Sequence, residues 1–493
     1  MPNESLTFNG IRKEWLYIER GRTKPPFAAL TRNILTVPGY PGGYLSSTEI
    51  RPLKINQPVG FRIEDDQDAL NKKDELAEWL VTNEPVSLEF DDEPGRIYYA
   101  VVENAIDDFE KMATLRRGTI TFVCPGPYAY GPERTYTFPS DYVSVTNEGT
   151  HEAKPIFELE VLTPVTFAMI QNQHDEYMMI GKPADDDVSV IDAKQLIYQL
   201  TSTDLSNWIS RPRDVNSSFV DPTVGGVSDG TYTHDGTGVI VNNYGTPFTE
   251  RGGYGPSIYR ELPSSIQDFE MEAIFDTRTD LLEENFRMEV YLFDEGMKNI
   301  GKIGIRDRFA EFHNRSGLAR AGEYVDESTR YVIGRANYDY NNLGKSSMFI
   351  FRWKREGQRF TFYVAEIVNG KHVNTLTRTF TDRTNQWTGK IKYVQLFIRS
   401  WKGRNPPYLA RFNDLKIYEL TQATQDETPY IAYPGDIITF DHKDEEMLLN
   451  GENVMRLKDF GARFFELQKG TNELVVHPSN AFNVSMTYRE TFK

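Results

Sequence analysis

Hydrophobic residues along this chain mostly alternate with polar ones, in short runs separated by turn residues. Leu6-Thr7-Phe8 runs into Asn9-Gly10, and both of these last residues tolerate positive φ, which favours a hairpin. Similar runs occupy 86–90, 97–102 and 118–124. Alternation with a period of two is typical of a strand with one buried side, so the sequence predicts a protein built mainly of β-sheet.

One segment near the start has helical spacing instead. Between Gln67 and Thr82 the apolar residues fall near a single stripe, at Leu70, Leu76, Ala77 and Leu80. Pro85 follows and ends the helix. The first part of the chain is therefore expected to be a small sheet with one helix packed on it.

The segment 37–44 cannot lie inside a sheet. It contains two prolines, which lack a backbone donor, and three glycines, which are conformationally free: Pro38, Pro41, Gly39, Gly42 and Gly43. We expect a loop or arm there. Contact with a neighbouring subunit and an ordinary surface loop are both open interpretations of it.

The end of the chain predicts an insertion. The strand signals at 435–440 and 486–488 belong to a segment with too few strands to bury a core alone, so it needs the strands near 142–182 as partners. The intervening region, about 193–422, has strand signals bounded by turns at 269–275, 286–293, 348–353, 360–364, 393–398 and 415–420. Short strands at such spacing are typical of an antiparallel sandwich or jelly roll.

Composition narrows the possible functions. Asp and Glu outnumber Lys and Arg by 72 to 55, and the net charge of −17 argues against a nucleic-acid partner. The single cysteine, Cys124, excludes an intrachain disulfide and a cysteine zinc site, and we expect it to be a small buried filler. No apolar run approaches the ~20 residues of a spanning helix, and 1–15 lacks a signal-peptide core, so we expect no membrane insertion and assembly in a cytoplasm.

Several short motifs follow one another along the chain. They are Leu6-Thr7-Phe8-Asn9-Gly10-Ile11, Leu76-Ala77-Glu78-Trp79-Leu80 followed by Val86-Ser87-Leu88-Glu89-Phe90 and the segment 91–99, Phe122-Val123-Cys124-Pro125-Gly126-Pro127, Gly435-Asp436-Ile437-Ile438-Thr439-Phe440, Leu467-Gln468-Lys469-Gly470, and Met486-Thr487-Tyr488-Arg489. Their order and spacing resemble the distal tail proteins of long-tailed phages that infect Gram-positive bacteria. The resemblance covers about 1–190 and 428–493 and leaves the middle unexplained.

The resemblance implies a fold with three domains. An N-terminal split-barrel domain, 1–138, would form a six-fold ring at the end of the tail tube. A galectin-like sandwich built from 139–192 and 423–493 would project outward. The long insert, 193–422, is a departure from the basic pattern and resembles the carbohydrate-binding modules that some enlarged members carry within the second domain.

The same resemblance implies a function. It is that of a structural hub in the virion, at the distal end of the tail, and not of an enzyme; no cofactor or metal is expected. The expected partners are other copies of the chain in a hexameric ring, the tail tube protein, and a tail-associated or tail-tip protein. Host cell-wall polysaccharide is the expected ligand of the insert.

Strand 393–401 offers a candidate saccharide surface. Alternation directs Val394, Leu396 and Ile398 inward and places on the opposite face Tyr393, Gln395, Arg399 and Trp401. Aromatic rings with planar polar neighbours suit the apolar and hydroxyl faces of a sugar. The alternative is that both faces are covered and Trp401 fills a corner of the core.

A second candidate for sugar binding lies at 338–342, where Tyr338 and Tyr340 are the aromatic residues. An ordinary surface loop is the competing interpretation of this segment.

Catalysis is the alternative function, because related jelly rolls include glycoside hydrolases. These need two carboxylates across the scissile bond, and Glu270 and Glu272 have the spacing of one strand face. A third same-face carboxylate of the familiar Glu-x-Asp-x-x-Glu pattern is missing. The competing interpretation is that Glu270 and Glu272 lie on the solvent-exposed face of an edge strand. The remaining polar candidates are expected to be solvated charges or loop histidines: Asp276, Asp280, 185–187, His234 and His442.

Overall fold

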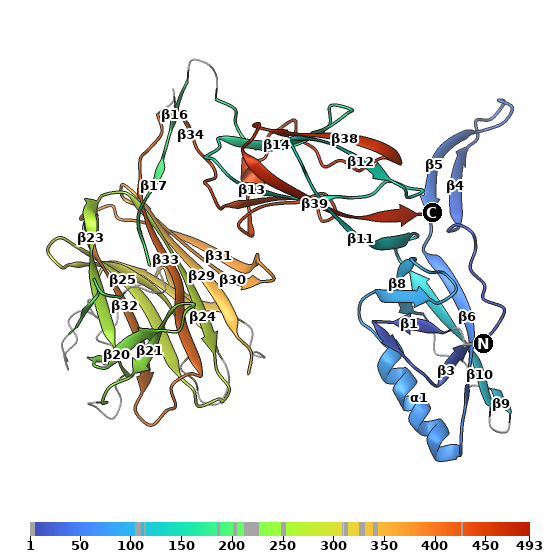
Figure 1. Cartoon of the computed structure of the whole chain (residues 1–493), viewed down its shortest axis with the longest axis horizontal. Coiled ribbons are helices and arrows are strands. Elements are labelled where there is room, and N and C mark those ends of the chain that lie inside the picture. Colours follow the sequence, from blue (N-terminus) through green and yellow to red (C-terminus); the bar gives the residue numbers. More distant parts are fainter. Residues whose placement is uncertain are drawn as a thin grey trace.

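The computed structural model describes residues 5–493 except 104–109, 113–114, 185–187, 201–204, 212–225, 248–252, 308, 310–313, 325–330, 339–343 and 425–426. Strands dominate it, so the prediction of a mainly β protein, with a sandwich interrupted by a second sandwich, is confirmed. Three hydrophobic cores lie along the molecule, and Figure 1 shows the corresponding units in a row, with the insert at one end and the N-terminus at the other.

The N-terminal unit is a small sheet covered by one helix. Its strands are β1 (Leu6–Phe8), β2 (Ile11–Arg12), β3 (Leu16–Ile18), β6 (Leu53–Arg62), β7 (Val86–Phe90), β8 (Ile97–Val102), β9 (Glu110–Met112) and β10 (Leu115–Cys124). Helix α1 (Asp66–Leu80) begins after Asp65, whose carboxylate accepts the Asp68 N–H at 2.8 Å. Trp79 anchors the helix by donating to the Phe8 carbonyl at 2.9 Å.

The predicted apolar stripe of α1 is only partly correct. Leu76 and Leu80 are buried together with Ala69 and Trp79, but Leu70 and Ala77 are exposed. The reason is that the helix presents Ala69, one position earlier, to the sheet. Cys124 is fully buried at the end of β10, as expected, and burial raises the pKa of its thiol to about 12.

The second unit is a sandwich whose strands come from two distant parts of the chain. They are β11 (Ala129–Thr137), β12 (Tyr142–Asn147), β13 (Ile156–Val161), β14 (Phe167–Asn172), β15 (Tyr177–Gly181), β35 (Ile437–Asp441), β36 (Glu446–Leu449), β37 (Glu452–Asn453), β38 (Gly470–His477) and β39 (Phe482–Phe492), with a 3-10 turn at Met455–Leu457. Strand β13 lies between β35 and β39, and β38 lies between β12 and β14. Neither half closes this core alone.

Strand β39 also joins the sandwich to the N-terminal unit. Its second half pairs with β11, from Ser485 opposite Thr137 to Phe492 opposite Ala129, and β11 touches β8 at Tyr130. Phe492 packs against the N-terminal core, under the guanidinium of Arg96 at 3.3 Å from the ring centre. One sheet therefore runs through both units.

The insert is a second sandwich of two large sheets. The first contains β17 (Lys194–Gln199), β20 (Thr231–His234), β21 (Val239–Asn243), β24 (Phe269–Arg278), β29 (Ser347–Glu356), β30 (Arg359–Val368), β31 (Lys371–Thr381) and β33 (Leu409–Leu420). The second contains β18 (Ile209–Ser210), β19 (Gly226–Ser228), β22 (Gly253–Gly255), β23 (Ser257–Ile266), β25 (Phe286–Asp294), β26 (Asn299–Asp307), β27 (Ser316–Ala321), β28 (Ile333–Asn337) and β32 (Ile391–Trp401).

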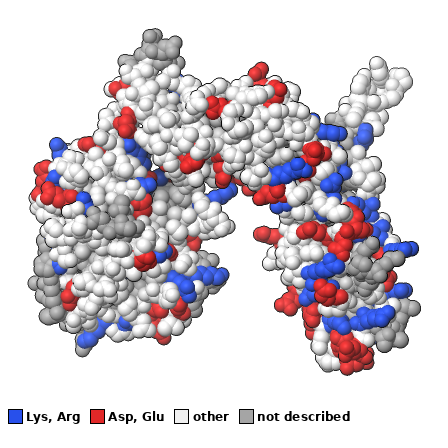
Figure 2. Space-filling view, in the orientation of Figure 1, with Lys and Arg blue, Asp and Glu red and all other residues white. Residues whose placement is uncertain are grey.

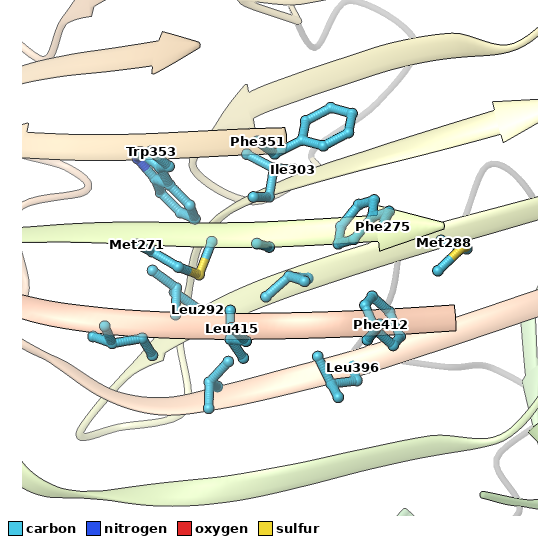
Figure 3. Packing of buried hydrophobic residues seen from close by; sticks show 14 of the residues in the cluster. Met271, Phe275, Met288, Leu292, Ile303, Phe351, Trp353, Leu396, Phe412 and Leu415 are labelled. Atoms are coloured by element: carbon cyan, nitrogen blue, oxygen red, sulfur yellow. The ribbon is translucent and has the colours of Figure 1, made fainter. Parts of the chain in front are cut away.

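Aromatic side chains fill the space between the two sheets of the insert (Figure 3). The Phe275 ring lies 4.9 Å from that of Phe351 and 5.1 Å from that of Phe412, and Trp353 is fully buried elsewhere in the same cluster, with its ring 5.4 Å from that of Phe269. Such large rings bury much apolar area and dominate the free energy of a core. The insert thus has a core of its own, independent of the sandwich from which it emerges.

Both ends of the insert leave the sandwich at one place. The parallel strands β16 (Ser189–Ile191) and β34 (Glu427–Pro429) form the tether, and Lys194 pairs with Leu420 at the start of the insert. Beyond the tether, the turn at Gly370 touches the turn at Gly451, where the His372 N–H donates to the Gly451 carbonyl at 2.9 Å. A Cβ at Gly451 would collide with the Gly370 carbonyl, so this close approach requires glycine.

Ion pairs reinforce this junction. Arg352 of β29 contacts Glu272 at 2.9 Å within the insert and Glu452 of the sandwich at 2.7 Å. Lys371 contacts Glu446 of the sandwich at 2.8 Å. Although burial opposes ionisation of Glu272, the charges of Arg352 and Lys194 lower the pKa of its carboxyl. The insert is therefore docked on the sandwich as well as tethered to it.

His442 lies in the sandwich core and not in a solvated loop, which corrects the expectation from its polar sequence neighbours. It is 2% exposed, with its ring 5.3 Å from that of Phe157 and 4.4 Å from that of Phe465. The Phe465 N–H donates to its Nδ1 at 2.9 Å. Burial lowers the pKa of His442 to about 4.

We predict that the sandwich loses stability on mild acidification. The unfolded chain protonates His442 near pH 6.5 and the folded one only near pH 4, so the free energy of unfolding should fall as pH drops through this window, by about 3 kcal/mol in total. Urea titrations followed by circular dichroism will measure it. An equal loss in His442→Gln, which does not titrate there, would contradict the assignment.

We also predict that Arg352→Met frees the insert from the sandwich. It leaves Glu452 without its cation and Glu272 with Lys194 alone, a cost of roughly 3 kcal/mol for a largely buried pair, so small-angle X-ray scattering should show a larger radius of gyration. Lys354→Met, two residues along the same strand and paired locally with Glu356, is the control. Identical scattering of the two variants would show that the ion pair does not hold the junction.

Candidate functional site

A two-stranded arm projects from the N-terminal unit. Strand β4 (Leu30–Leu35) pairs only with β5 (Tyr44–Ile50), and among the described residues no further strand joins them. The expected loop at 37–44 is the turn of this hairpin. The sequence did not predict its two strands, because both faces of each strand are exposed. Hydrophobic and polar residues alternate only where one face of a strand is buried.

The arm exposes an unusual amount of apolar surface. Its exposed large side chains are Leu30, Ile34, Leu35, Val37, Tyr40, Tyr44, Leu45 and Ile50. Between Arg32 and Glu49 the sequence has no charged residue, and Figure 2 shows the arm as a white extension beside charged surface. Contiguous apolar patches of this kind mark interaction sites on soluble proteins.

Strand β32 carries four of the six residues predicted to bind sugar. It lies between β23 and β25, and Val394, Leu396 and Ile398 enter the core as predicted. On the opposite face, however, Gln395 and Arg399 are completely buried. Only Tyr393 and Trp401, near the two ends of the strand, are partly exposed.

The buried face of this sheet holds a charged cluster that the sequence did not reveal. The Glu289 carboxylate of β25 accepts hydrogen bonds from Arg399 at 2.8 Å, Lys302 at 2.7 Å and the Tyr291 hydroxyl at 2.5 Å. Although burial opposes it, the charges of Lys302, Arg287 and Arg399 hold the pKa of Glu289 well below its usual value. This cluster could have been predicted from the polar residues at alternate positions of β25, namely Arg287, Glu289 and Tyr291.

Arg399 differs from its neighbours in this cluster. Its Nη2 reaches Glu289, whereas its Nε and Nη1 are buried with no hydrogen-bond partner in the part of the chain that the structure describes. Buried donors are normally satisfied, so this guanidinium has unused capacity for a polar ligand. Trp401 follows two residues later on the same face of β32.

The second predicted sugar site is corrected by the structure. Tyr338 is only 2% exposed, and its ring lies 4.8 Å from that of Phe349 in the core of the insert. It follows the end of β28 and packs inward, so it cannot line a surface platform. Tyr340 lies outside the described residues.

The carboxylates of the hydrolase alternative belong to the junction with the sandwich. Strand β24 lies between β29 and β33, so Glu270 and Glu272 are on a central strand and not on an edge strand. Lys194 contacts Glu270 at 2.6 Å, and Arg352 contacts Glu272. A general acid needs a raised pKa, and that of Glu272 is lowered instead.

The other acidic candidates also have structural partners. Asp280 pairs with Arg278 at 2.7 Å, and Asp276 pairs with Arg411. The run 185–187 lies outside the described residues. Within the described ranges no group of three or more His, Cys, Asp or Glu side chains is arranged to hold a metal ion, and no helix is long and apolar enough to cross a membrane.

Two family models match the ends of the chain. Residues 11–124 match the phage tail protein RIFT-related domain, and residues 406–492 match the C-terminal domain of the siphovirus-type tail component. The distal tail protein of Bacillus phage SPP1 is 30% identical over 135 residues, which cover 27% of this chain and 52% of that relative. The match therefore spans about half of the relative's length.

Solved structures of several kinds match parts of the chain. The SPP1 distal tail protein is 18% identical with a TM-score of 0.33, covering 36% of this chain and 74% of that one. The CBM2 module of the evolved distal tail protein of Lactobacillus casei BL23 phage J-1 is 13% identical with a TM-score of 0.38, covering 48% and 100%. An endo-β-1,3-glucanase from Pyrococcus furiosus is 12% identical with a TM-score of 0.31, covering 48% and 100%.

These TM-scores are low, so the assignment to a family rests on the sequence matches at both ends of the chain. The two family-model matches lie on the N-terminal unit and on the C-terminal part of the chain. The chain belongs to the distal tail protein family of siphoviruses, is a component of the virion at the distal end of the tail, and is enlarged by a sandwich inserted into its second unit.

Proposed function

We propose that this chain assembles into a ring, of six copies by analogy with its family, that joins the tail tube to the tail-tip proteins. The observation that carries the proposal is the arm β4–β5, which exposes many apolar side chains, carries no charge between Arg32 and Glu49, and pairs with no other strand in the described part of its own chain. A surface of this kind is stable in water only when another surface covers it. The remaining partners are the tail tube protein and a tail-associated or tail-tip protein.

The domain limits expected from the sequence fit this role. With 1–138 in the ring and 139–192 plus 423–493 projecting from it, the insert 193–422 lies farthest from the tube. Figure 1 supports this order, because the insert and the arm lie at opposite ends of the molecule. Assembly would take place in the host cytoplasm before the tail is complete.

For the insert we propose binding of host cell-wall saccharide without hydrolysis. The partly exposed Trp401 lies two residues from the buried Arg399, whose Nε and Nη1 lack partners within the described ranges, and the partly exposed Tyr393 lies near the other end of the same strand. Aromatic rings stack on sugar C–H faces, and a guanidinium donates to hydroxyl or acidic groups. This arrangement supports binding, while the ion-paired state of Glu270 and Glu272 disfavours a catalytic role for them.

We predict that Ile34→Asp abolishes ring assembly. Ile34 lies opposite Leu45 in the arm, so a carboxylate there must be desolvated when a neighbour covers the arm. Multi-angle light scattering should show a ring-sized species for the natural sequence and a 56.7 kDa monomer for the variant. Leu70→Asp, an exposed leucine on α1, is the control and should still assemble. A natural chain that stays monomeric would refute the hub.

We predict that the insert is needed for saccharide binding and not for the ring. Because Lys194 pairs with Leu420, a short glycine linker can replace 195–420 without strain, and this deletion should leave the oligomer intact. Binding of the full-length ring to extracted host cell-wall polysaccharide should fall at least tenfold in Trp401→Ala and remain in Tyr408→Ala, an exposed aromatic elsewhere on the insert. Equal binding by the deletion, or release of reducing sugar by the natural chain, would contradict the proposal.

A further inference from the structure

A pocket lined by tyrosines lies where the N-terminal unit meets the sandwich. Its volume is about 540 Å³, and its walls include Tyr99 of β8, Tyr128, Tyr130 of β11 and Tyr488 of β39. The rings of Tyr99 and Tyr130 meet edge to face at 5.6 Å, and Tyr99 remains 37% exposed. Because β8, β11 and β39 belong to one sheet, the pocket is rigid and already formed.

The charges around this tyrosine pocket balance. Three acidic and three basic side chains line it: Glu133, Glu152, Glu466, Lys154, Lys443 and Arg489. Arg489 contacts Glu133 at 3.5 Å. The pocket therefore does not select a charged ligand, and its aromatic walls favour an apolar or aromatic group.

The tip of the arm has the complementary chemistry. Pro38-Gly39-Tyr40-Pro41 presents two proline rings and a tyrosine that is 63% exposed, and the tip carries no charge. Gly39 has φ +84°, and the Tyr40 N–H donates to the Val37 carbonyl at 3.0 Å, which closes a turn with proline at its second position. The Tyr40 ring stacks on Tyr44. A tip fixed in this way loses little conformational entropy on binding.

We propose that the tip of the arm, 38–41, of one copy seats in the tyrosine pocket of the next copy. This rests on the proposed ring assembly and names the surface that receives the arm. The arm and the pocket are different surfaces of one chain, so the contact is head to tail, the type that generates closed rings. In Figure 1 the arm extends away from the body of its own chain, which leaves its tip available to a neighbour.

Cysteine cross-linking tests the contact, because the only native cysteine, Cys124, is fully buried. Tyr40→Cys and Tyr99→Cys chains are prepared separately, mixed so that rings reassemble, and oxidised gently with oxygen. We expect a disulfide-linked dimer on non-reducing gels that disappears with reductant, since bridging requires Cα atoms within about 7 Å. Tyr142→Cys, an exposed tyrosine of the sandwich outside the pocket, replaces Tyr99→Cys in the matched control and should give no dimer.

A second measurement uses no cysteine. Tyr40→Ala and Tyr99→Ala should each raise the concentration at which the ring half-dissociates by tenfold or more, and the double variant should add little to either single one, because both remove the same contact. If the alanine variants form rings as readily as the natural chain, and the cysteine variants give no cross-linked dimer, the pocket assignment is overturned while the hub proposal stands. A natural chain that forms no oligomer would overturn both.

Discussion

Strand β39 is the element on which the rest of this structure depends. Its backbone pairs with β13 on one side, inside the sandwich, and with β11 on the other, at the border of the N-terminal unit. A strand hydrogen-bonded along both edges cannot move without breaking two ladders, so it fixes the two units with respect to each other. The tyrosine pocket exists because of this, since Tyr488 of β39 and Tyr130 of β11 are held on one continuous sheet.

The insert obeys a related constraint. Its first and last strands, β17 and β33, are paired, so its two ends lie side by side. The sandwich therefore accommodates a large inserted unit without a change in its own strands. Docking at Gly370 and Gly451, with Arg352 bridging to Glu452, then restricts the insert to one orientation. A fixed orientation would matter for the host binding and the ring proposed above, because several copies would then be able to engage one surface together.

Much of the architecture follows from alternation alone. The inward positions Val394, Leu396 and Ile398, the buried Cys124 and the interruption of a sandwich by a second one are all readable from the period and the spacing of the strands. The error at the candidate saccharide surface has a simple cause. Alternation tells which side of a strand faces the core, but it does not tell what covers the opposite side, and so Gln395 and Arg399 were placed on an accessible surface.

The remaining differences depend on contacts between distant parts of the chain. Glu272 pairs with Arg352, and His442 lies against Phe157 and Phe465, far from the polar residues that surround it in sequence. The arm escaped prediction for the opposite reason, because a hairpin exposed on both faces has no buried period to detect. The uncharged, apolar stretch between Arg32 and Glu49 was the usable signal, and it indicates a surface for assembly and not a folding core.

Electron cryomicroscopy of the purified full-length chain tests the central claim most directly. The account predicts a closed ring with the N-terminal units at the inner rim, the arms spanning neighbouring copies, and the inserts at the periphery. Isolated single copies, or a ring held together through the inserts with the arms free in solvent, would contradict it.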